Sequence, residues 1–129
     1  MKESITYGDL ELEVMSQLWD ADRPLSVTEV HHRLNATREL AYTTVMTVLS
    51  NLYKKSAVDR AKQGKAFLYW AVQKRDEAAA GFFQNLLQKV YRNSPADLVA
   101  GFLKTNAPLS AKEVEQLREE LQRIENNFD

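Results

Sequence analysis

The chain has 129 residues, of which 44% are hydrophobic, so it is long enough for one compact domain or for a small domain with an attached oligomerisation element. It contains no cysteine, which excludes disulfides, thiol nucleophiles and thiolate zinc sites. Neither a signal-peptide pattern nor an apolar run long enough to span a bilayer occurs, so we expect a cytoplasmic protein with no membrane partner.

The formal net charge of -1 hides an uneven distribution of charged side chains. Residues 1–29 carry two basic and seven acidic side chains, whereas residues 30–72 carry seven basic and two acidic ones. Screening confines the influence of each charge to about 10 Å at ordinary salt. A segment with a local net charge of +5 can therefore bind a polyanion even though the whole chain is slightly acidic.

Two helices are predicted before the most basic part of the chain. A wide apolar arc at helical spacing predicts a buried helix over residues 9–21, which stops at a turn ending in Pro24. The sequence Ser26-Val-Thr-Glu29 is a capping box, in which the serine accepts from an early backbone N–H and the glutamate reaches back to the cap. It predicts a second helix that runs to about Asn35.

The stretch from Ala41 to Lys55 predicts a helix with two unlike faces. Its small polar and basic residues share one arc, which consists of Thr43, Thr44, Thr47, Ser50, Asn51 and Lys54. The opposite arc is apolar and is expected to face the core, with Val45, Met46, Val48, Leu49, Leu52 and Tyr53. Most solvated helix faces carry Glu and Lys, which are better helix formers than Thr, Ser and Asn. The polar face therefore indicates a need for short hydrogen-bonding side chains, with an ordinary solvated face as the alternative.

Two short alternating runs follow the two-faced helix. They span residues 58–62 and 66–71 and are separated by Gln63-Gly64-Lys65, a pattern that predicts a β-hairpin with a basic tip. Three helices followed by a hairpin is the order of a winged helix-turn-helix. We therefore expect a mainly α fold with a small β-hairpin, in which residues 1–73 form a winged-helix DNA-binding domain.

The remaining residues, 74–129, are predicted to form a helical dimerisation domain. Amphipathic helices are expected over residues 74–92, from Ser94-Pro95 to about Lys104, and after a second capping box that begins at Ser110. Their apolar stripes are too broad for one chain to bury, and a symmetric homodimer would cover them. The predicted dimerisation residues are Phe82, Phe83, Leu86, Leu87, Val90, Leu98, Phe102, Leu117, Leu121 and Ile124.

No pattern of residues indicates catalysis or a bound cofactor. His31 and His32 are adjacent, so on a helix they point about 100° apart and cannot bind one metal ion together. We expect His31 to be half-buried beside the core stripe and His32 to lie on the surface. No glycine-rich nucleophile turn surrounds a serine, and no phosphate-cradling loop occurs. The sequence therefore predicts neither an enzyme nor a cofactor or metal site.

Three segments together resemble the penicillinase-repressor (BlaI/MecI/CopY) family of bacterial winged-helix repressors, over nearly the whole chain. They are Gly8-Asp-Leu-Glu-Leu-Glu-Val-Met15 with Leu18-Trp19, Tyr42-Thr-Thr-Val-Met-Thr-Val-Leu49, and Gly64-Lys-Ala-Phe-Leu-Tyr69. The resemblance implies a homodimer with interlocked C-terminal helices, whose winged domains bind an inverted-repeat operator. It implies repression of antibiotic-resistance genes of the β-lactamase type.

Members of this family differ in the signal that induces them. The copper-responsive branch carries a cysteine-rich motif, which this chain lacks, so that mode of sensing is excluded. In the β-lactam branch a membrane sensor or protease pathway inactivates the repressor by cleaving an Asn–Phe bond. The matching bond here joins Gly101 to Phe102, so the phenylalanine fits the family and the glycine departs from it, which leaves cleavage open.

The predicted DNA-binding residues divide into two groups. Thr43, Thr44 and Thr47 stand at the front of the recognition helix, where side chains reach base edges in the major groove. Phosphate contacts are expected from residues further along the helix, in the turn and in the wing. The full set is Arg38, Tyr42, Thr43, Thr44, Thr47, Ser50, Asn51, Lys54, Lys55, Arg60 and Lys65.

Other readings of these residues remain open. Lys54 and Lys55 could serve only the dipole at the C-terminal end of their helix, and Lys65 could serve only solubility. The winged domain could bind protein instead of DNA, as an interaction module. The chain could also be a structural helical dimer with an incidental wing.

Overall fold

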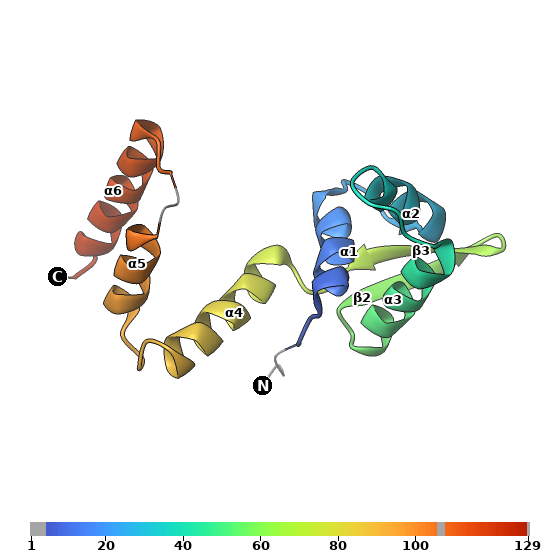
Figure 1. Ribbon diagram of the computed structural model, residues 1–129, viewed down its shortest axis with the longest axis horizontal. Coiled ribbons are helices and arrows are strands. Elements are labelled where there is room, and N and C mark those ends of the chain that lie inside the picture. Colours follow the sequence, from blue (N-terminus) through green and yellow to red (C-terminus); the bar gives the residue numbers. More distant parts are fainter. Residues whose placement is uncertain (1–4, 106–107, 129) are drawn as a thin grey trace. The chain divides into compact units, whose positions relative to one another are not determined.

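The computed structural model describes residues 5–105 and 108–128, and the chain divides into two compact units after Asn85 (Figure 1). The first unit contains α1 (Asp9–Asp20), β1 (Leu25–Ser26), α2 (Val27–Asn35), α3 (Tyr42–Lys54), β2 (Val58–Gln63) and β3 (Ala66–Ala71). The helix α4 (Arg75–Lys89) begins in the first unit and ends in the second, which also contains α5 (Pro95–Lys104) and α6 (Ala111–Glu125).

The first unit is a winged helix-turn-helix, as predicted. Its three helices gather beside a β2–β3 hairpin whose turn projects beyond their ends (Figure 1). The sheet is antiparallel with the order β1-β3-β2, and β3 pairs Tyr69 with Leu25 on one side and Ala71 with Val58 on the other. The hairpin was predicted from its alternating pattern, whereas β1 has two residues and is too short to show any periodicity.

The core of this unit is built from one apolar stripe on each helix. Its largest fully buried side chains are Met15, Leu25, Leu49, Leu52, Val14, Val30 and Val45. The expectation for α3 was partly wrong, because Met46 and Tyr53 are 44% and 39% exposed although their neighbours on the apolar arc are buried. The arc predicted from sequence was too wide at one edge, the edge that carries Met46 and Tyr53.

Two hydrogen bonds fasten Gln73, which lies two residues before α4, to the N-terminal part of the chain. The indole Nε1 of Trp19 donates to the carbonyl oxygen of Gln73 at 2.9 Å, and the hydroxyl of Tyr7 donates to the Gln73 side chain at 2.5 Å. Burial, with Glu11 and Glu77 nearby, raises the pKa of Tyr7 to about 12. Ala78, in the first turns of α4, is buried in the same core, so the start of α4 packs with the winged helix.

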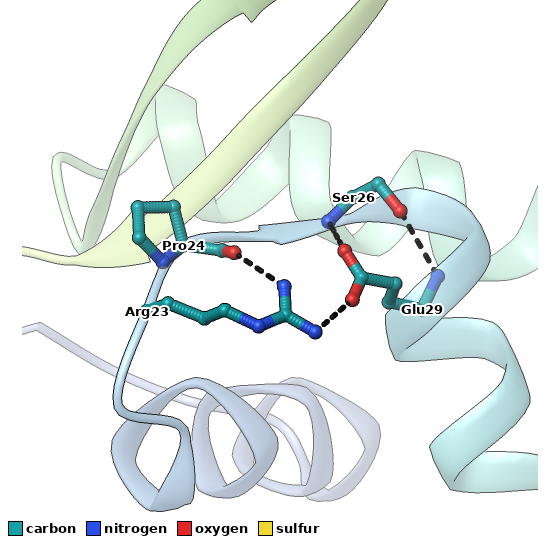
Figure 2. A network of polar contacts seen from close by, with 4 residues as sticks. All are labelled: Arg23, Pro24, Ser26 and Glu29. Atoms are coloured by element: carbon teal, nitrogen blue, oxygen red, sulfur yellow. Dashed lines mark hydrogen bonds and ion pairs between the residues drawn. The ribbon is translucent and has the colours of Figure 1, made fainter.

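The capping box predicted at the start of α2 is present and is extended by an arginine (Figure 2). The backbone N–H of Glu29 donates to Oγ of Ser26 at 3.1 Å, and the backbone N–H of Ser26 donates to Oε1 of Glu29 at 3.1 Å. Arg23 pairs with the other carboxylate oxygen of Glu29 and donates to the carbonyl of Pro24. This network joins the turn after α1 to the first turn of α2.

We expect this network to make stability depend on acid pH through Glu29. Its hydrogen bonds with Arg23 and Ser26 lower the pKa of Glu29 from 4.5 to about 2. A carboxyl group whose pKa falls on folding contributes stability that is complete above about pH 4.5 and is lost as the pH falls toward 2. Urea unfolding at a series of pH values should therefore show a shallower acid loss of stability for Glu29→Gln and for Arg23→Ala than for the unmodified chain. If both variants lose stability with falling pH as steeply as the unmodified chain does, this dependence on Glu29 is contradicted.

The second unit consists of helices whose starts are also capped by serines. Oγ of Ser94 accepts from the N–H of Asp97, and Ser110 forms a capping box with Glu113, as predicted. Gly101 packs closely against the Tyr91 side chain. A Cβ added to this glycine would lie 2.9 Å from Cζ of the tyrosine. No helix within residues 5–105 and 108–128 is both long and apolar enough to cross a membrane.

Candidate nucleic-acid interface

The turn between α2 and α3 is held by two side chains from α2. Oδ1 of Asn35 accepts from the backbone N–H of Leu40 at 2.8 Å, and Nε2 of His31 lies 2.6 Å from the Leu40 carbonyl oxygen. The His31 ring also meets the Tyr42 ring edge-on, with centroids 5.8 Å apart. As predicted, His31 is half-buried and His32 exposed. Because both backbone polar groups of Leu40 are bonded to α2, the direction in which α3 leaves the turn is fixed.

The polar face of α3 is open to solvent. Thr43, Thr44, Thr47, Asn51 and Lys54 are exposed and Ser50 is half-buried. The opposite face, with Val45, Val48, Leu49 and Leu52, is buried. No side chain caps the N-terminus of α3, since the cap residue is Ala41, so the first N–H groups of this helix have no side-chain acceptor there. The surface of α3 that faces outward is thus rich in short donors and acceptors.

Two cations of the predicted DNA-binding set contact acidic residues of α1. Nη1 of Arg38 lies 3.0 Å from a carboxylate oxygen of Glu13. Nζ of Lys55 donates to Oε1 of Glu11 at 2.7 Å and to the carbonyl oxygen of Thr6 at 2.7 Å. Burial opposes ionisation of Glu11, but the hydrogen bonds from Lys55 and from the Gly8 N–H leave its pKa below the usual value. The charge of Lys55 is therefore paired with a carboxylate of the same domain.

Arg60 on β2 is held between two aromatic rings. Its guanidinium carbon lies 4.1 Å from the centroid of Tyr53 on α3 and 4.4 Å from that of Phe67 on β3. Nη1 donates to the hydroxyl of Tyr69 at 3.3 Å, and this hydrogen bond raises the pKa of Arg60. Both rings are partly exposed, and the guanidinium lies over each of them in a favourable cation–π arrangement. The sandwich joins the recognition helix to the wing and fixes where the charge of Arg60 lies.

The wing ends in a tight turn at Gly64 and Lys65. Gly64 takes a φ of +63°, a conformation that costs glycine little and other residues more. Lys65 is exposed at the tip, and Lys62 is exposed on β2. Lys62 lies two residues after Arg60, so both point to the same face of the strand. Lys62 was not among the predicted DNA-binding residues, although the two-residue alternation of a strand places it on the same face as Arg60.

The family model described as penicillinase repressor matches residues 7–123. The chain belongs to the penicillinase repressor family. This family is one of repressors and not of enzymes, and the match confirms the resemblance carried by the three sequence segments.

Individual relatives match to different extents. The transcriptional regulator BlaI of Mycobacterium tuberculosis is 48% identical over 80 residues, which cover 62% of this chain and 58% of that protein. The methicillin resistance regulatory protein MecI of Mammaliicoccus sciuri is 30% identical over 108 residues, covering 84% of this chain and 86% of that protein. A penicillinase repressor of Staphylococcus aureus is 30% identical over 114 residues, covering 88% and 89%. The chain thus spans less than two thirds of the mycobacterial relative and most of the other two.

Two solved structures share the winged domain. The DNA-binding domain of the repressor BlaI has a TM-score of 0.53 and 31% identity, and it covers 60% of this chain and 93% of that domain. The monomeric form of BlaI from Bacillus licheniformis, solved in complex with the blaP half-operator, has a TM-score of 0.50, 31% identity and the same coverage. The structural likeness therefore lies in the part of the chain that carries α3 and the wing.

Proposed function

We propose that this protein is a transcriptional repressor that binds an inverted-repeat operator as a cytoplasmic homodimer and regulates β-lactam-resistance genes. The observation that carries the proposal is the exposed threonine-rich face of α3 beside a cationic wing. Membership of the penicillinase repressor family and the half-operator complex of a BlaI relative support it. A winged domain that binds only protein would have no need of this combination of a polar reading face and a local charge of +5.

The side chains divide the work of binding according to where they lie. Thr43, Thr44 and Thr47, at the front of α3, offer hydroxyl and methyl groups to base edges in the major groove. Ser50 and Asn51 lie one to two turns later and contact phosphates. Tyr42 orients the start of the helix by packing on His31.

Phosphates are bound mainly by the cations that are not neutralised within the domain. Lys54, Lys62, Lys65 and the stacked Arg60 supply this sequence-independent part of the affinity. Arg38 keeps an exposed guanidinium and adds to it, whereas Lys55 acts mainly in stability because Glu11 compensates its charge.

The region 74–129 is proposed to dimerise. Among the described residues, its helices carry apolar side chains that this chain alone does not cover. Phe83 is 58% exposed and Leu121 is 66% exposed. The other exposed members are Phe82, Leu86, Val90, Phe102, Leu117 and Ile124, while Leu87 and Leu98 are half-buried. A second copy of the chain would cover these apolar side chains, and its own would be covered in return, as is usual in a symmetric oligomer. Two domains would then meet the two halves of a symmetric operator.

Inactivation by a sensor or protease pathway stays a prediction for this chain. The bond between Gly101 and Phe102 lies inside α5, so a protease would have to unwind that helix. An asparagine at position 101 would need the Tyr91 side chain to move.

The salt dependence of DNA binding tests the proposed function. Duplexes enriched from a random library by the full chain should bind more weakly as salt rises, with a linear fall of log affinity against log salt. Lys54→Ala should reduce the slope by about one for each subunit, because one phosphate contact is lost. Lys55→Ala is the matched control: it should leave the slope unchanged and lower the melting temperature.

One outcome would count against this assignment, and another would change the role given to Lys55. Absence of duplex binding even at low salt would leave the protein-interaction module as the better reading. Equal changes of slope in the two lysine variants would mean that the contact of Lys55 with Glu11 opens when DNA binds.

A further inference from the structure

The side chain of Met46 is a large apolar group that is exposed on the recognition helix. It is 44% exposed, whereas Val45, Val48 and Leu49 around it are buried. On an α-helix the residues three and four positions away are neighbours, and for Met46 these are the exposed Tyr42 and Thr43, the half-buried Ser50 and the buried Leu49. Met46 therefore lies at the border between the buried face and the face that carries the threonines, with its side chain open to solvent.

The other large apolar residues exposed on α3 have roles inside the protein. Tyr42 packs its ring against His31 in the turn, and Tyr53 presents its ring to the Arg60 guanidinium. Neither role is open to methionine, because its side chain has no aromatic face and no strong polar group. An unbranched thioether is, however, well suited to fill an irregular apolar surface supplied by a partner.

The surroundings of Met46 identify the chemistry of that partner. The same outward face carries the exposed Thr47 and Lys54, and Lys62 and Lys65 of the wing are exposed as well. A cationic surface of this kind fits a polyanion and not an apolar protein surface. In the major groove of DNA, only thymine presents an apolar group to such a side chain, its C5-methyl.

We propose that Met46 is a specificity-determining residue that packs against the C5-methyl group of a thymine in each operator half-site. The proposal rests on the proposed function, since it requires that α3 enters the major groove. Met46 stands in the first half of the helix, the part of a recognition helix that contacts base edges. The thymine methyl and the methionine would remove apolar surface from water together, and neither group would lose a hydrogen bond.

The test removes the methyl group from the DNA and the side chain from the protein, separately and together. Duplexes are enriched from a random library with the full chain, and each recurrent thymine is then replaced by deoxyuridine. At the contacted position the unmodified protein should bind about fourfold more weakly per half-site, the value expected for one methyl group. Met46→Ala should show no further loss at that position, and Met46→Leu should keep most of the sensitivity. Coupling between the two changes is what identifies a direct contact.

Lys54→Ala serves as the matched control, because it should weaken all duplexes and keep the fourfold deoxyuridine effect. Alanine favours the helix, so a melting curve of Met46→Ala should match that of the unmodified chain. If every thymine gives the same loss in the unmodified protein and in Met46→Ala, the assignment is wrong while the proposed function stands. If the unmodified chain enriches no sequence at all, the proposed function fails and this inference fails with it.

Discussion

Replacing Thr44 and Thr47 together with alanine is expected to abolish selective operator binding while the dimer stays intact. Both side chains are exposed, and alanine is a better helix former than threonine, so the fold should not suffer. Each lost hydrogen bond should cost about 1 kcal/mol. A dimer on two half-sites loses four of them, so the affinity should fall about a thousandfold.

The measurement compares affinities for an enriched duplex and for a scrambled duplex of equal length. The double variant should bind both about as weakly as the unmodified chain binds the scrambled one, because the phosphate contacts remain. Sedimentation should give the same dimer for both proteins. A preserved preference for the enriched duplex would instead favour a structural helical dimer in which the wing is incidental.

Replacing Leu49 with alanine should destabilise the winged domain more than any surface change on α3. Leu49 is fully buried in the core beside Leu52 and Met15. Truncating a buried leucine removes apolar contacts and leaves a cavity, at a cost of about 2–5 kcal/mol. That is a large part of the stability of a small domain, which is about 5–15 kcal/mol in total.

Urea unfolding followed by tryptophan fluorescence would measure this loss, since Trp19 and Trp70 both lie in the winged domain. The midpoint should fall at an unchanged slope. Met46→Ala is the control, and it should change stability by less than about 0.5 kcal/mol because the side chain is exposed. Similar costs for the two variants would mean that α3 is rotated about its axis relative to the core.

Much of the fold could be predicted because the signals for it are local. The capping boxes at Ser26 and Ser110 connect residues three positions apart, so their sequence alone indicates where α2 and α6 begin. The hairpin around Gly64 depends on a turn and on two-residue alternation. The threonine face of α3 follows from helical periodicity, which is independent of the rest of the molecule.

The candidate site was less predictable where its residues are brought together from distant parts of the chain. Arg60 could be recognised as a basic residue of the wing, but its place between Tyr53 and Phe67 depends on how the hairpin packs against α3. Lys62 was not predicted either, although its two-residue spacing from Arg60 is visible in the sequence and needs no knowledge of the tertiary structure.

The sequence by itself determined which residues form helices and hairpin, which face of α3 is polar, and the family to which the chain belongs. Periodicity, caps and turns act over a few residues, and they are written directly in the chain. Only the tertiary structure decided that Lys55 is neutralised by Glu11, 44 residues earlier, while Lys54 stays free of that contact. It also decided that Met46 faces outward, because the width of a buried stripe is set by the neighbouring helices and not by the apolar residues themselves.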